Sequence, residues 1–214
     1  MNEHMILNGT GMATMAFAAI CGVLRLRSMD RGGKLILLLI VLGLLTEAVA
    51  TWAGIYYRNN MPVYAVFNVV EVVLVSLFYD ESLDLFRRRR AGRVIAALAV
   101  LLWIANLLWL QSIKVSNSNF MILGGVYIIV FSSLAAFRDQ LDEPEQHRLH
   151  FWLNLVLLFY WGISLLTWFL YDDMVRFLGK GSRYPMLTIH IINWLTNLSF
   201  SAVFLFTPKT KHYE

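Results

Sequence analysis

The sequence predicts an all-α membrane protein: a bundle of seven transmembrane helices in a single domain, 1–214. Two observations predict this class. Hydrophobic residues make up 58% of the chain, charged residues only 15%, and the mean hydropathy is +0.61. A soluble domain is typically about half apolar and a quarter charged, so this composition is typical of a membrane protein. The apolar residues also fall into runs near the ~20 residues that a helix needs to cross a bilayer.

Seven apolar runs are candidates for transmembrane helices. The first is rich in Gly, Ala and Thr, whereas the others are dominated by large aliphatic and aromatic residues. The predicted spans are 6–24, 35–57, 62–79, 94–110, 119–137, 149–171 and 185–206. No loop between them is long enough to hold a soluble catalytic domain.

Lys and Arg are distributed unequally between the two sides of this predicted bundle. Thirteen of the 18 fall in one set of loops and five in the other. Because basic loops stay on the cytoplasmic side, we predict an outside N-terminus and an inside C-terminus. The same clustering accounts for the net charge of +4 without a nucleic-acid partner.

The densest charge cluster is the run Arg87–Arg90. Its pattern favours an anchor at the cytoplasmic membrane surface, beside anionic lipid headgroups. Docking of a soluble partner is the alternative. Asp80, Glu81 and Asp84 come just before the run, and we expect them to neutralise part of its charge.

A second polar segment, 139–150 (DQLDEPEQHRLH), places His147 and His150 near Glu143 and Glu145. Two histidines at this spacing do not complete a zinc ligand set. A solvated loop is therefore the favoured interpretation, and we predict neither a metal site nor a cofactor.

Two carboxylates lie deep inside apolar runs: Glu47 in the second span and Glu71 in the third. Burying a carboxylate in a bilayer costs several kcal/mol unless it is protonated, paired or hydrated, so such residues are functional candidates. At ~1.5 Å per residue, Glu47 lies ~15 Å and Glu71 ~13 Å below the same membrane surface. We therefore predict that the two carboxylates share a site.

Other polar residues gather on single helix faces in the same half of the bundle. The third span carries Tyr64, Asn68 and Glu71 at helical spacing, and the seventh carries His190, Asn193, Asn197 and Ser201. The sixth span offers Tyr160, Ser164, Thr167 and Tyr171. Together they predict an outward-facing polar pocket lined by Glu47, Tyr64, Asn68, Glu71, His190, Asn193 and Asn197. Alternatively, the Asn and Ser residues only join helices, for ~0.6 kcal/mol each.

Known classes of membrane protein with catalytic or chromophore motifs do not fit these residues. The seventh span has no lysine for the Schiff base of a microbial rhodopsin, and His190 is the one histidine deep in a span, too few for a ceramidase-type hydrolase. The protease motifs HExxH, GxGD and GxSxG are absent. We therefore predict that the protein is not an enzyme.

The segment 59–79, NNMPVYAVFNVVEVVLVSLFY, resembles a pattern in small, uncharacterised heptahelical proteins of bacteria. That family implies no activity. Pro62 and Pro185 each open a span that carries an asparagine further on. This layout is similar to the three-plus-one-plus-three plan of the SWEET sugar transporters, although their PQ motif is absent.

We therefore expect a bacterial inner-membrane protein that binds a proton or a small polar or cationic ligand in its outward-facing pocket. It would act as a sensor or an accessory subunit, with the lipid bilayer as its environment and another membrane protein or a second copy as its partner. A small-molecule or proton-coupled transporter using the same pocket is the alternative. An enzyme and a purely structural protein rank below both.

Overall fold

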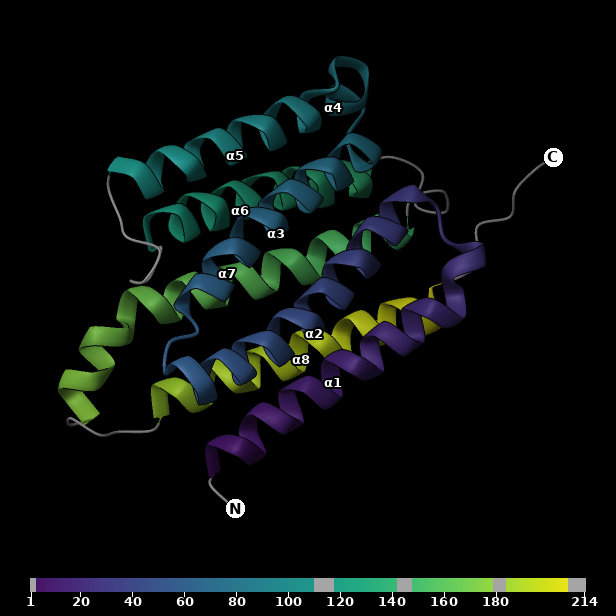
Figure 1. Cartoon of the computed structure of the whole chain (residues 1–214). Coiled ribbons are helices and arrows are strands. Elements are labelled where there is room, and N and C mark those ends of the chain that lie inside the picture. Colours follow the sequence, from purple (N-terminus) through teal and green to yellow (C-terminus); the bar gives the residue numbers. More distant parts are fainter. Residues whose placement is uncertain (1–2, 110–117, 142–147, 179–183, 208–214) are drawn as a thin grey trace.

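The computed structural model is all-helical and describes residues 3–109, 118–141, 148–178 and 184–207 (Figure 1). Its elements are α1 (Glu3–Arg25), η1 (Leu26–Ser28), α2 (Arg31–Tyr57), α3 (Met61–Ser82), α4 (Asp84–Arg89), α5 (Ala91–Trp109), α6 (Ser118–Leu141), α7 (Arg148–Leu178) and α8 (Tyr184–Phe206). Seven of these described helices are long and apolar enough to cross a membrane, all except the short α4. This confirms the prediction of an all-helical bundle with seven helices long and apolar enough to span a membrane, while the orientation of its termini stays a prediction.

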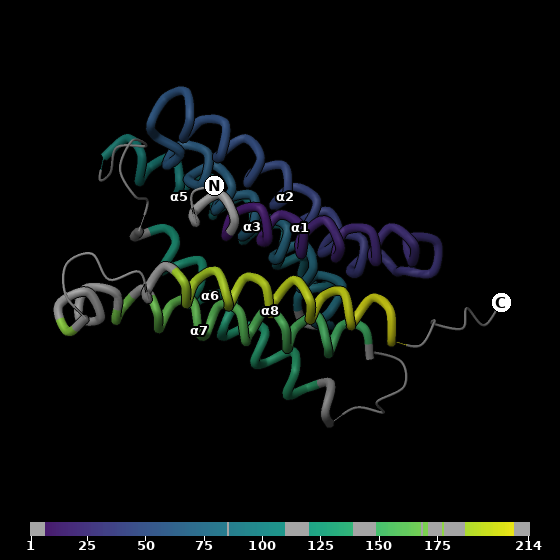
Figure 2. The backbone as a smooth tube through the Cα atoms, turned by 90° about the horizontal axis from the view of Figure 1, so that it is seen from below, coloured from purple at the N-terminus to yellow at the C-terminus, as the bar shows by residue number. Residues whose placement is uncertain are grey.

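The long helices pack in a closed circuit. α1 contacts α2, α2 contacts α3, α3 contacts α6, and α6, α7 and α8 lead back to α1. The circuit is flattened into two layers, with α1, α2 and α3 on one side and α6, α7 and α8 on the other (Figure 2). α5 packs against the outside of α3, and α2 also contacts α7 across the circuit.

α3 has the largest share of buried residues among the seven spans that the structure describes. Val75, Phe78 and Tyr79 have no exposed surface. The Tyr79 hydroxyl donates to the carbonyl oxygen of Ile128 at 3.0 Å and lies 2.7 Å from the Ser132 hydroxyl. Because a polar group within the bilayer must find its partners inside the protein, these contacts fix α3 against α6.

The connection from α2 to α3 is short because its residues favour an abrupt turn. Arg58 ends α2 in the left-handed conformation, with φ 54°. The Asn59 side chain then accepts the N–H of Met61 at 3.0 Å, and Pro62 occupies the first turn of α3. The two helices are therefore antiparallel neighbours, with the middle of α2 beside the first half of α3.

α5 is held to α3 at a glycine. The Gly92 N–H donates to Asp80 Oδ1 at 2.7 Å, and Arg93 Nε lies 3.8 Å from Asp80 Oδ2. A Cβ atom at Gly92 would collide with the backbone carbonyl oxygen of Ser76. Only glycine permits this approach of the two backbones.

Replacing Gly92 with alanine should therefore destabilise the protein by about 1–3 kcal/mol, since the added methyl group forces α5 away from α3. The measurement is reversible unfolding in mixed micelles with increasing denaturing detergent. Gly162→Ala is the matched control, because an added Cβ there meets nothing within 4 Å. Equal stability of the two variants would contradict the close approach of α3 and α5.

Candidate functional site

Glu47 lies in the middle of α2 and contacts α3. The Tyr64 hydroxyl, in the first turns of α3, donates to Glu47 Oε2 at 3.0 Å. Both side chains are partly exposed in the isolated bundle. Two of the residues predicted for the pocket are thus in direct contact. Asn68, one turn further along α3, is half-buried and makes no hydrogen bond to another described residue.

Glu71 lies about two turns beyond Tyr64 on α3 and is buried, with 7% of its surface exposed. The indole Nε1–H of Trp161, on α7, donates to Glu71 Oε1 at 3.0 Å. Trp161 is itself 5% exposed. An indole N–H in an apolar interior needs an acceptor, and a buried carboxylate needs a donor, so this hydrogen bond satisfies both groups.

Two glycines of α6 make room for this contact. A Cβ atom at Gly125 would lie 2.5 Å from Cε3 of the Trp161 ring, and one at Gly124 would lie 2.7 Å from Val72 Cγ2. Both positions are buried. The small residues therefore let α6 approach α3 and α7 closely enough for the indole to reach Glu71.

Tyr160, on α7, lies within electrostatic range of both carboxylates. Its hydroxyl interacts electrostatically with both Glu71 and Glu47, and it bonds to Ser164 one turn along α7. The rings of Tyr160 and Trp161 lie 5.6 Å apart. We call Glu47, Tyr64, Glu71, Tyr160 and Trp161 the acidic cluster.

The polar stripe of α8 makes its described contacts elsewhere. Asn197 donates to the Thr14 hydroxyl of α1 at 3.3 Å. The His190 ring lies 6.5 Å from that of Trp194 on its own helix, and Asn193 is half-buried. The structure thus joins Asn197 to α1, and a role for these three α8 residues in the pocket stays a prediction.

Two members of the acidic cluster were not among the predicted ligand-binding residues. Tyr160 belonged to a polar stripe of the sixth span, whereas Trp161 gave only one signal: a buried tryptophan usually finds an acceptor for its N–H. Which acceptor it finds depends on the packing of α3, α6 and α7, which local sequence patterns do not contain.

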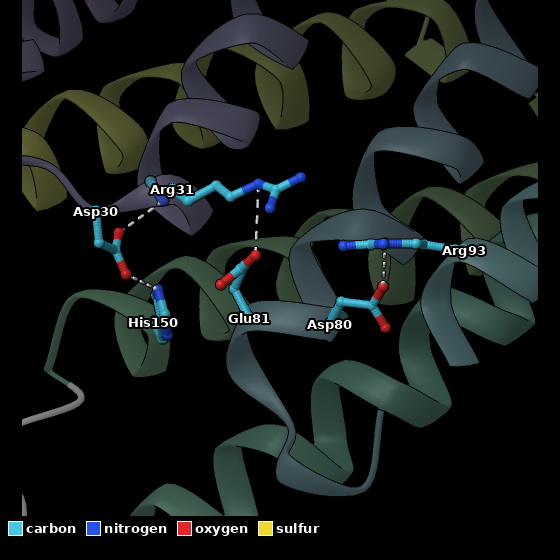
Figure 3. A network of polar contacts seen from close by, with 7 residues as sticks. Asp30, Arg31, Asp80, Glu81, Arg93 and His150 are labelled. Carbon is cyan, nitrogen blue, oxygen red and sulfur yellow. Dashed lines mark hydrogen bonds and ion pairs between the residues drawn. The ribbon is translucent and has the colours of Figure 1, made fainter. Parts of the chain in front are cut away.

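A second polar group lies at the end of the bundle that carries most of the arginines, here called the arginine-rich end. Figure 3 shows most of its ion pairs, which join α2, α3, α5 and α7. The pairs are Arg31–Glu81 at 3.5 Å, Arg93–Asp80 at 3.8 Å, Arg138–Asp84 at 2.7 Å and His150–Asp30 at 2.5 Å. Asp80, Glu81 and Asp84 therefore pair with arginines of other helices rather than with Arg87–Arg90.

Asp30 begins α2 and connects it to α7. Its Oδ1 accepts the Gly33 N–H at 2.9 Å, while its Oδ2 contacts His150. A Cβ atom at Gly32 would lie 2.6 Å from His150 Nε2, so this glycine makes room for the imidazole. Burial raises the pKa of Asp30, but the contact with His150 and the Gly33 N–H lower it more, leaving it below the usual 3.8.

No group of three or more His, Cys, Asp or Glu able to hold a metal ion occurs in the described ranges. His150 is committed to Asp30, whereas His147, Glu143 and Glu145 lie outside those ranges.

The Trp161–Glu71 bond can be measured by a double-mutant cycle. Trp161→Phe should cost about 1–3 kcal/mol of stability, because Glu71 keeps its burial and loses its donor. In a Glu71→Leu background the same change should cost clearly less, since no buried acceptor remains. Trp103→Phe is the control: its indole nitrogen is buried without a partner, so losing it should be nearly neutral. Equal costs of Trp161→Phe in both backgrounds would contradict the bond.

The lowered pKa of Asp30 predicts a pH dependence of stability. Asp30 should stabilise the folded protein fully above pH 3.8, and this contribution should be lost as the pH falls further, through the folded-state pKa. Thermal unfolding of the wild type and Asp30→Asn should therefore differ at neutral pH and converge in acid. A difference independent of pH would contradict this linkage.

Comparison with known proteins adds no further constraint. No protein-family model, no curated protein and no solved structure matches the chain. The composition and the seven described helices nevertheless identify the chain as a multi-pass integral membrane protein, with an acidic cluster within its spans.

Proposed function

We propose that this protein is a membrane sensor or accessory subunit that binds a proton or a small cation at the acidic cluster. The observation that carries the proposal is the burial of Glu71 with the Trp161 N–H as its one described hydrogen-bond donor. On the resemblance of its third span to heptahelical proteins of bacteria, the bacterial inner membrane is the proposed location.

The chemistry of the cluster favours a positively charged ligand. It holds two carboxylates, while its described donors, Tyr64, Trp161 and Tyr160, are all neutral. No described Lys or Arg pairs with Glu47 or Glu71. A proton or a cation would supply the missing positive charge, which lowers the cost of keeping carboxylates out of water.

The burial of the two carboxylates supports loading from one side. Glu47 is partly exposed and Glu71 is buried, and Tyr160 interacts with both. Glu47 lies nearer the α2–α3 connection than the arginine-rich end, and Glu71 lies near the middle of α3. A ligand would arrive at Glu47 from that side, which the predicted orientation makes the outside. The described residues include no soluble domain that could carry a signal. The effect of ligand binding would therefore pass to a neighbouring membrane protein or to a second copy of this chain.

Infrared difference spectroscopy tests the site. The wild type in lipid vesicles should show a pH-dependent carbonyl band of a protonated carboxyl in an apolar environment, and Glu71→Gln should abolish it. Glu81→Gln is the control, because Glu81 pairs with Arg31 at the bundle end and its loss should leave the band intact. At fixed pH, sodium or tetramethylammonium ions should reduce the band where a cation replaces the proton.

A band that survives in both Glu47→Gln and Glu71→Gln would overturn the proposal. So would the absence of any carboxyl band that responds either to pH or to the two cations.

The second candidate, a proton-coupled transporter, is favoured by the position of Tyr160, which lies within electrostatic range of a partly exposed and a buried carboxylate. The two candidates differ in net flux. If the protein is a transporter, vesicles holding a pH-sensitive dye should acidify after a pH jump, and Tyr160→Phe should slow this acidification by tenfold or more. If it is a sensor, the proton flux should not exceed that of vesicles without protein.

A further inference from the structure

The run Arg87–Arg90 is held in a fixed position by the residues before it. Leu83 and Phe86 are buried, with 8% and 4% of their surfaces exposed. The Phe86 ring lies 4.9 Å from that of Phe131 on α6 and 6.1 Å from that of Tyr79 on α3. The short helix α4 is thus pinned to the core by its apolar side, and its arginines cannot turn inward.

All four arginines of the run are exposed. Arg90 ends α4 in the left-handed conformation, with φ 51°, and its N–H bonds to the Phe86 carbonyl oxygen. None of the four guanidinium groups forms an ion pair with an acid in the part of the chain that the structure describes. Four adjacent positive charges therefore face outward, without an acidic partner among the described residues.

The three acids that come just before this run in the sequence are engaged elsewhere. Asp80, Glu81 and Asp84 pair with arginines of α5, α2 and α6, respectively. Their charges are balanced by those partners, so the excess positive charge remains on Arg87–Arg90.

The run also lies where the lipid-facing surface of α5 begins. About one turn after Arg90, Val94 is 56% exposed, and Leu98 and Leu101 continue the same apolar surface at 51% and 61%. An apolar surface of this kind on a membrane-spanning helix contacts acyl chains. The adjoining arginines therefore lie at the level of the lipid headgroups, which favours a lipid over a soluble partner.

We propose that Arg87–Arg90 form a binding site for anionic phospholipids, with the guanidinium groups on the headgroup phosphates and the acyl chains along α5. Arginine suits this role because its planar guanidinium donates two parallel hydrogen bonds to a phosphate. The net negative charge of the lipid matters as well, since each basic residue near an anionic surface strengthens binding about fivefold.

Native mass spectrometry of the full chain in detergent tests this proposal with two probes: phosphatidylglycerol and phosphatidylcholine with identical acyl chains. The wild type should bind phosphatidylglycerol in preference to phosphatidylcholine. Replacing all four arginines with glutamine should reduce this preference at least tenfold. Since the four side chains are exposed, the variant should keep the helical content and elution volume of the wild type.

Two further variants separate charge from geometry and position. Replacing the four arginines with lysine should keep most of the preference but weaken the binding. Arg58→Gln removes an exposed arginine at the α2–α3 connection and should leave the preference unchanged. Equal binding of the two lipids by the wild type, or an undiminished preference in the glutamine variant, would overturn the proposal and point to an acidic soluble partner.

Discussion

The hydrogen bond from Trp161 to Glu71 depends on how three helices pack, and it joins α7 to a buried carboxylate in the middle of α3. Lipid tails are as apolar as leucine, so no hydrophobic force drives helices together inside a bilayer. What remains is close packing and polar contacts that lipid cannot supply. At this site the packing comes from Gly124 and Gly125, and the polar contact from the indole.

The same combination of close packing and a polar contact holds the neighbouring helices along the rest of α3. Near the arginine-rich end, Gly92 lets the backbones of α3 and α5 meet while Asp80 accepts its N–H. Between the two sites, the Tyr79 hydroxyl bonds to α6. α3 is therefore the helix against which its neighbours pack, and its polar residues make the hydrogen bonds that hold them.

Local patterns were sufficient for the seven spans and for part of the site. Length and hydropathy are properties of each segment alone, and the short connection after Arg58 makes α2 and α3 neighbours, so Glu47 and Tyr64 could be placed together from the sequence. Pairs between distant helices could not. Asn197 meets Thr14 because α8 closes the circuit against α1, and Trp161 meets Glu71 because α6 leaves space. Such choices depend on packing of the whole bundle.

The ion pairs of the arginine-rich end run between helices rather than within them. The four described pairs fasten the ends of α2, α3, α4, α5, α6 and α7 to one another. Each of these helices takes part in at least one pair, so none of them can shift at this end without separating two opposite charges. Added salt screens exposed charges, so high ionic strength should weaken the connection between these helix ends.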